Sequence, residues 1–183
     1  KVGKTSFVEK AVQNLCGKIL AVKVAVSEGQ KNSVVSIENN EEKNVQKDTG
    51  RFLKAGAKKA VYLKSNLENL GKNLDELESK INEKFDYVIY EGNNIIDFIN
   101  PIFIIYLKNN SLEKKYSADK ASRKADIILD YSNKEKNIIF KKESMICYKA
   151  HLLADILGLS VGEIGKLLNK SGIKIKECQL GLF

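Results

Sequence analysis

The chain has 183 residues, enough for one domain of ordinary size or for one domain with a small addition. Hydrophobic residues make up 43% and charged residues 30%, which is typical of a soluble globular protein, and no apolar run approaches the length of a membrane span. Three cysteines are too few, and odd in number, for a disulfide framework, so a reducing cytoplasm fits best. The net charge of +8 comes almost wholly from lysine, which is more typical of a solvated surface than of specific base recognition.

The chain opens with residues that match the end of the phosphate-binding pattern G-x-x-x-x-G-K-[ST]. Lys4 would reach the β- and γ-phosphates, and the Thr5 hydroxyl would hold Mg²⁺. Gly3 and Ser6 complete the candidate loop, and a following helix should aim the positive end of its dipole at the same anion. We therefore expect a nucleotide site, whose first glycine and leading strand would lie before the first residue. The alternative is a chance match ahead of an ordinary helix.

Apolar periodicity predicts that strands alternate with helices along most of the chain. We expect strands at residues 19–26, 33–37, 60–63, 86–90, 102–107, 127–129 and 137–140, and helices directly after Thr5 and at 51–54, 67–81 and 119–125. This order predicts a three-layer, mostly parallel α/β sheet of the P-loop NTPase type. Ligands of such sheets bind beyond the carboxyl ends of the strands, where the phosphate-binding loop also belongs.

Mg²⁺ beside a phosphate needs one or two carboxylates, and the sequence offers Asp48 in a loop and Glu91 at a strand end. Glu91 would hold a metal-bound water or orient the attacking water, so it joins Lys4 as the candidate catalytic pair. Gly92 would let the backbone approach a ligand closely. Arg51 is a candidate for phosphate contact or loop closure, with a surface salt bridge as the equal alternative.

Two further charged residues lie on these strands. Asp86 begins the strand that Glu91 ends, about 17 Å away along it, so we expect a structural role for Asp86. Lys23 lies inside an apolar strand, where a buried lysine needs a partner. Its other possible place is near the strand end, facing the nucleotide.

Four segments together resemble the MobB family, P-loop GTPases associated with molybdopterin guanine dinucleotide synthesis. They are the G-K-T-S at 3–6, the strand at 20–23, the K-D-T-G-R and A-G-A at 47–57, and the Y-E-G at 90–92. The resemblance covers about the first 130 residues. It implies GTP and Mg²⁺ as cofactors, held by Lys4 and Thr5, with Asp48 on the metal side and Glu91 as the strand-end acid. It also implies slow GTP hydrolysis and partners from the molybdenum cofactor pathway.

The chain departs from the MobB pattern in two places. The histidine-bearing segment that the family has after its second strand is replaced by V-A-V-S-E-G at residues 24–29. The guanine-reading motif N-K-x-D is also missing, and residues 106–110 are only a weak substitute for it. The choice of GTP over ATP therefore rests on the resemblance.

From about residue 145 the pattern changes to two helices, at 147–157 and from 161 onward with Ser160 as the cap, and a short strand at 173–176. We place a domain boundary here, between a P-loop NTPase domain at 1–143 and a helix-turn-helix-like module at 144–183. The module would read DNA, with the strand as a wing, or contact another protein, and the alternative to both is a structural helical hairpin. The alternative function is therefore a nucleotide-gated DNA-binding regulator, with DNA less favoured as a partner because the second helix lacks arginine. A second copy of the chain is a further candidate partner.

Cys147 and His151 lie one helical turn apart, and Cys178 follows the short strand. Together they offer two thiolates and an imidazole to a second metal ion. The alternative is a pair of buried cysteines and an ordinary histidine.

Overall fold

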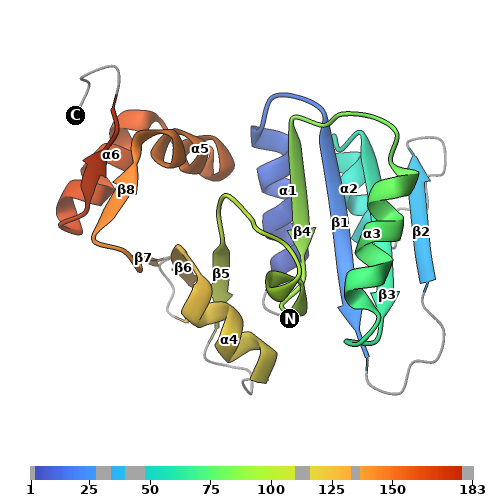
Figure 1. Ribbon diagram of the computed structural model, residues 1–183. Helices are drawn as coiled ribbons and strands as arrows, with labels where there is room; N and C mark the ends of the chain where they lie inside the picture. Colours follow the sequence, from blue (N-terminus) through green and yellow to red (C-terminus); the bar gives the residue numbers. More distant parts are fainter. Residues whose placement is uncertain (1–2, 28–33, 40–47, 110–115, 133–136, 179–183) are drawn as a thin grey trace. The chain divides into compact units, whose positions relative to one another are not determined.

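The computed structural model describes residues 3–27, 34–39, 48–109, 116–132 and 137–178. The protein is a mixed α/β fold with mostly parallel sheets (Figure 1). The chain divides into two compact units, Lys4–Asn100 and a second unit from Pro101 onward, and each is described by itself. The expected domain boundary between residues 143 and 144 falls inside the second unit and stays a prediction.

The first unit is built on a four-stranded sheet with the order β2-β3-β1-β4. Its strands are β1 (Ile19–Val26), β2 (Val34–Asn39), β3 (Lys59–Ser65) and β4 (Tyr87–Glu91). The central strand β1 pairs in parallel with both β3 and β4, while β2 is antiparallel to β3. An antiparallel edge strand on a parallel sheet is common in large α/β folds. The strand predicted at 19–26 is confirmed as β1, with the same bounds.

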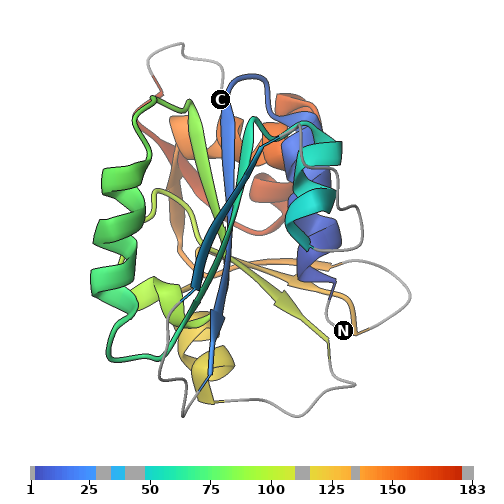
Figure 2. The same ribbon diagram turned by 90° about the vertical axis from the view of Figure 1, so that its right-hand side faces the viewer.

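Helices cover both faces of this sheet. They are α1 (Lys4–Asn14), α2 (Asp48–Ala55), α3 (Leu70–Lys80) and the 3₁₀ helix η1 (Asn94–Asp97). In Figure 2, α1 and α2 lie on one face of the sheet and α3 on the other, so this unit has three layers. The helix predicted at 67–81 is shorter in the structure, where it runs from Leu70 to Lys80. Leu67 precedes it and is 53% exposed, so it does not belong to the apolar face of the helix.

The side chains of β1 alternate between the two layers, as the pleat of a strand requires. Leu20, Val22 and Val24 belong to the core beneath α3. The remaining members of that core are Val61, Leu63, Leu70, Leu74, Leu77 and Ile95. Lys23, at an odd position, therefore lies on the face that α1 and α2 cover. Burial of this apolar area is the main force that holds the unit together.

The second unit contains two smaller sheets. Its elements are β5 (Ile105–Lys108), α4 (Tyr116–Lys124), β6 (Ile127–Asp130), β7 (Asn137–Phe140), β8 (Ser144–Ile146), α5 (Cys147–Leu157), α6 (Val161–Lys170) and β9 (Lys174–Lys176). One sheet has the order β5-β6-β7, with β5 and β6 parallel and β7 as the antiparallel edge. The other sheet is the parallel pair of β8 and β9.

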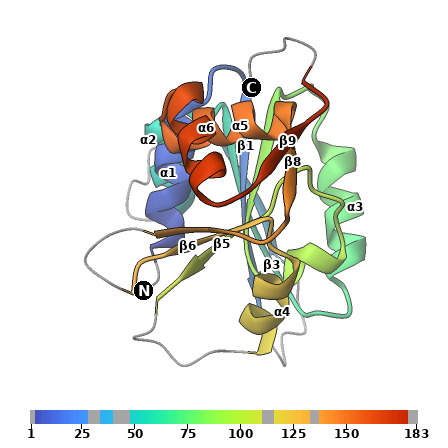
Figure 3. The ribbon, with the colours of Figure 1, turned by 90° about the vertical axis from the view of Figure 1, so that its left-hand side faces the viewer.

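The helices α5 and α6 form a hairpin beside β8 and β9 (Figure 3). The first helix ends at Gly158, which has a left-handed φ of 65°, and Ser160 caps the second helix in a capping box with Glu163. Both features agree with the predicted helix bounds. The strand expected as a wing pairs in parallel with β8, so these two strands are linked by a helical crossover and not by a hairpin turn. Within the described residues, no helix is both long and apolar enough to cross a membrane.

Candidate functional site

The expected site residues of the first unit meet at the carboxyl ends of β1 and β4. Glu91 is the last residue of β4, and the parallel register sets it directly opposite Lys23 of β1. Lys4 begins α1 and Asp48 begins α2, so two helix N-termini reach the same end of the sheet. This end combines strand ends with positive helix-dipole ends, which is where α/β proteins bind anionic ligands.

Four side chains at this end form a hydrogen-bonded cluster, the Lys23 cluster, made of Thr5, Lys23, Asp48 and Glu91. The Lys23 ammonium forms ion pairs with Glu91 and with Asp48 Oδ2, the latter at 3.0 Å. The Thr5 hydroxyl donates to Glu91 Oε2 at 3.1 Å. The Glu91 residue is only 4% exposed, so its charge needs these partners. Lys23 is therefore a half-buried lysine with partners inside the strand, which is the first of the two alternatives, and a place facing the nucleotide stays a prediction.

The charges of the cluster stabilise one another. Burial lowers the pKa of Lys23, but the hydrogen bonds and charges of Glu91 and Asp48 outweigh it, and the net pKa lies above the usual value. Burial likewise raises the pKa of Asp48, while the hydrogen bonds from Lys23 and Thr5 and the charge of Arg51 bring it below the usual value. Lys23 is therefore a cation and Asp48 an anion at neutral pH.

The first helical turn of α1 adds further donors. Lys4 Nζ donates to Asn93 Oδ1 at 3.5 Å, a long hydrogen bond. Gly3, just before the helix, has a φ of 80°, in the left-handed region that favours glycine. Asn93 was not among the predicted site residues. The sequence signal that could have identified it is its position, two residues after the strand-end acid.

The close approach of Val24 in the neighbouring strand explains why residue 92 is a glycine. A Cβ at this position would lie 3.0 Å from the Cβ and from the carbonyl oxygen of Val24. The sheet therefore needs glycine here, because any side chain would push β1 and the end of β4 apart. The expected role of Gly92 in ligand approach stays a prediction beside this structural one.

Arg51 reaches from α2 to α1. Its Nε donates to Glu9 Oε1 at 2.9 Å, and its terminal nitrogen contacts Glu9 Oε2 at 2.5 Å and Ser6 Oγ at 3.0 Å. The bidentate pair with Glu9 corresponds to the salt-bridge alternative and ties the two helices together beside the cluster. Sequence reasoning did not select Glu9, because nothing local distinguishes it from the acids of other helices.

Asp86 lies at the opposite end of β4, as expected. Its Oδ2 accepts the backbone N–H of Lys18 at 2.6 Å. This bond anchors the turn before β1 to the start of β4. A structural role at a distance from the candidate site follows.

The oxygen atoms of Thr5, Asp48 and Glu91 fit the ligand preference of Mg²⁺, which takes one or two carboxylates and completes its shell with water and phosphate. Within the described residues, no three His, Cys, Asp or Glu side chains are grouped so that they would hold a metal ion on their own. That statement includes Cys147, His151 and Cys178, although the two sulfur atoms lie 3.5 Å apart. Thr5, Asp48 and Glu91 would therefore suit a magnesium ion that binds together with a phosphate group.

Comparison with known proteins adds no relative. No family model matches the chain, and neither a curated protein nor a solved structure is significantly similar to it.

Proposed function

We propose that the Lys4–Asn100 unit binds GTP with Mg²⁺ and hydrolyses it slowly. The observation that supports this most is the Lys23 cluster, because it gathers a lysine, a hydroxyl and two carboxylates at the carboxyl end of β4 beside the N-terminus of α1. Those are the groups that nucleotide phosphates and their metal require. The second carboxylate, Asp48, is not needed to neutralise Glu91, because Lys23 alone supplies the opposite charge.

The chain's own residues would divide the work as follows. Backbone N–H groups at the start of α1 would donate to phosphate oxygens, assisted by the helix dipole. Lys4 would exchange its long hydrogen bond with Asn93 for a charged contact to phosphate, which is the stronger bond. Lys23 would keep Asp48 ionised and remain paired with Glu91 while the polyanion binds.

Mg²⁺, when bound, would neutralise phosphate charge. Thr5 and the carboxylates of Asp48 and Glu91 would hold it, directly or through water. Glu91, which is buried and contacts Thr5 and Lys23, would orient an attacking water. Positioning and charge neutralisation without a stronger base suit a slow hydrolase.

The resemblance to MobB supports the biological setting of this proposal. It suggests that the GTP-bound form acts with an enzyme or carrier of molybdopterin guanine dinucleotide synthesis. That partner assignment depends on the same four segments that include Lys4, Asp48 and Glu91.

Lys4→Ala tests the nucleotide proposal. GTP affinity, measured by calorimetry with Mg²⁺ on the full-length protein, should fall by at least about 100-fold, because a charged contact to phosphate is lost. Lys10→Ala is the matched control, since Lys10 lies exposed on the same helix. Equal GTP affinity of the Lys4 and Lys10 variants would refute the assignment of the phosphate site.

The exposed face of α6 favours a second candidate function, DNA binding gated by the nucleotide. Glu163, Lys166, Asn169 and Lys170 are all exposed on it. A gel-shift series with duplex DNA at rising salt separates this function from the first. Binding that persists at moderate salt and weakens as salt rises would support a DNA reader, and no binding at moderate salt would discard it.

A further inference from the structure

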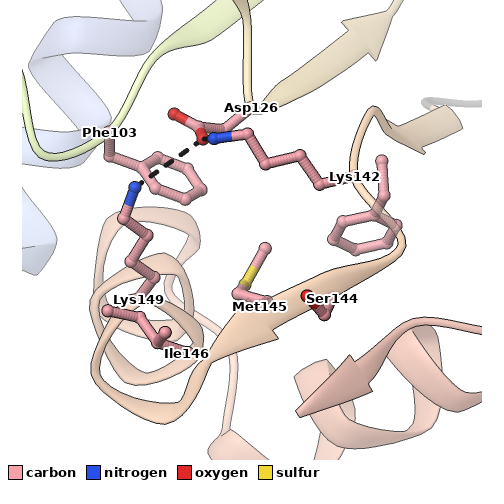
Figure 4. A pocket seen from close by; sticks show the side chains of 8 residues that line it. Phe103, Asp126, Lys142, Ser144, Met145, Ile146 and Lys149 are labelled. Atoms are coloured by element: carbon pink, nitrogen blue, oxygen red, sulfur yellow. Dashed lines mark hydrogen bonds and ion pairs between the residues drawn. The ribbon is translucent and has the colours of Figure 1, made fainter. Parts of the chain in front are cut away.

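The second unit contains a pocket with a volume of about 290 Å³ (Figure 4). It lies at the start of β6, next to the end of β7, to β8 and to the first turn of α5. Its lining residues are Phe103, Asp126, Phe140, Lys142, Ser144, Met145, Ile146 and Lys149. The volume is at the lower end of the range of small-molecule sites, which is roughly 300–1,000 Å³.

Part of the pocket lining is apolar. Two phenylalanine rings, Phe103 and Phe140, form it together with Met145 and Ile146. Met145 is 8% exposed, and Figure 4 shows its side chain pointing into the pocket. Such a wall would take an aromatic ring or a branched aliphatic group.

The lining also contains two lysines and one acid. Lys142 Nζ lies 2.6 Å from Asp126 Oδ1, and Lys149 Nζ lies 3.7 Å from the same oxygen atom. The second oxygen of Asp126 accepts the backbone N–H of Ile104 at 2.8 Å, so this acid is fixed in place. Lys149 also lies over the Phe103 ring, 5.8 Å from its centroid.

The charges in the pocket do not balance. Two ammonium groups face a single carboxylate, which leaves one positive charge in excess. Each ammonium has three N–H donors. Lys142 donates one of them to Asp126, whereas Lys149, at 3.7 Å, is paired with the same oxygen by charge but is too far away for a hydrogen bond. The pocket therefore pairs an apolar wall with donors suited to an anion.

We propose that this pocket binds a small organic carboxylate with an aromatic or branched aliphatic body. The body packs between Phe103, Phe140 and Met145, and the carboxylate accepts hydrogen bonds from Lys142 and Lys149. A bare inorganic anion would leave the apolar wall uncovered, and a neutral ring would leave the excess charge unpaired. The site is independent of the proposed nucleotide function, since all of its residues lie in the second unit.

Benzoate is a suitable probe, and Met145 is a suitable reporter because it is the single methionine of the sequence. Full-length protein carrying ¹³C-methyl methionine is titrated with benzoate, and Met145→Leu assigns the signal. We expect a saturable shift of the Met145 methyl resonance with benzoate. Benzyl alcohol, neutral and of similar shape, and inorganic phosphate should each bind at least about tenfold more weakly.

Two variants test the charge argument in opposite directions. Lys149→Met keeps the side-chain stem and should weaken benzoate binding about tenfold. Asp126→Asn still accepts the Ile104 N–H but frees both ammonium groups, so it should tighten binding several-fold. Lys166→Met, on the exposed surface of α6, is the matched control and should change nothing.

The outcomes separate binding from a merely structural role of the lysines. If the lysines serve only to neutralise Asp126, no saturable shift appears, or neither variant changes the affinity, and the proposal is overturned. Should one variant fail to fold, as judged by its circular dichroism spectrum, the other still predicts a definite direction.

Discussion

Two buried acids, one in each unit, use the same ingredients in different ways. Glu91 ends β4 and meets a lysine from a neighbouring strand, a hydroxyl from α1 and, through that lysine, an acid from α2. Asp126 precedes β6 and meets a backbone N–H and two lysines that follow it in the chain. Glu91 therefore lies at a carboxyl strand end and Asp126 at an amino end.

A buried acid depends most on its lysine partner where water cannot take the place of that lysine. Lys23 has a side chain that is only 19% exposed, whereas the side chain of Lys142 is 63% exposed. Water can replace Lys142 as a partner of Asp126, but it cannot easily replace Lys23 next to Glu91. The two regions should consequently respond unequally to loss of their lysines.

The largest effect is expected from Lys23→Met. It leaves Glu91 buried without its cation, so the free energy of unfolding should fall by about 3 kcal/mol. Urea unfolding followed by circular dichroism measures it, since the chain has no tryptophan. The double variant Lys23→Met/Glu91→Gln should recover part of the loss, because a neutral amide needs no cation.

The difference in unfolding free energy between wild type and Lys23→Met should depend on pH. The pKa of Lys23 is raised on folding, so its contribution is fully present below its unfolded pKa of 10.5 and is lost as the pH rises through the folded value. The stability gap between wild type and Lys23→Met should therefore stay constant across neutral pH and narrow only in strong alkali. A gap that closes near pH 8 would contradict the cluster geometry.

The next effect concerns the second unit alone. The Sγ atoms of Cys147 and Cys178 lie 3.5 Å apart, although the two cysteines are 31 residues apart in the chain. Oxidised glutathione should join them: the two thiols lose two protons and two electrons, and the oxidant leaves as two molecules of glutathione. The cross-link should stabilise the protein by about 3 kcal/mol and raise its melting temperature, and dithiothreitol should reverse the change.

Burial, followed by the hydrogen bond with Cys178, raises the pKa of the Cys147 thiol. Because the thiolate is the reactive form, oxidation should accelerate as the pH rises toward 9. The experiment uses a Cys16→Ser background, since Cys16 is exposed, and Cys178→Ser as the control. Mass spectrometry that finds no intramolecular bond in the background protein would rule out this pairing.

A smaller effect is expected from Lys142→Met. With its partner Asp126 still bound to the Ile104 N–H and to Lys149, the free energy of unfolding should change by less than about 1 kcal/mol. The same urea unfolding applies. A loss as large as that of Lys23→Met would erase the contrast between the two regions.

The smallest effect concerns Asp130. Hydrogen bonds from the Lys108 side chain and from the side chain and backbone of Ser132 lower its pKa to about 2. The stabilisation is present above the unfolded pKa of 3.8 and is lost as the pH falls through about 2. Lys108→Met should raise the pKa of Asp130 in an NMR titration, while Lys124→Met should leave it unchanged.

Local patterns were enough for much of the secondary structure. The helix at 147–157 and the strand at 19–26 match their predicted bounds, because apolar spacing and the flanking glycines report short-range geometry. The strand β8 was not predicted, since a three-residue strand carries too little periodicity. Its pairing with β9 comes from chain segments about 30 residues apart.

For the candidate site, local patterns were enough to identify the chemical groups and to predict that Glu91 lies at the end of a strand, because those properties depend on neighbouring residues. The sequence also predicted that Asp86 would lie away from the site, since strand rise is fixed by the backbone. Three contacts depend instead on how the elements pack. Lys23 pairs with both Glu91 and Asp48, Arg51 pairs with Glu9, and Val24 lies too close to Gly92 to leave room for a side chain there. Each of these contacts joins residues far apart in the chain, and long-range distances depend on strand register and helix packing, which no short sequence window contains.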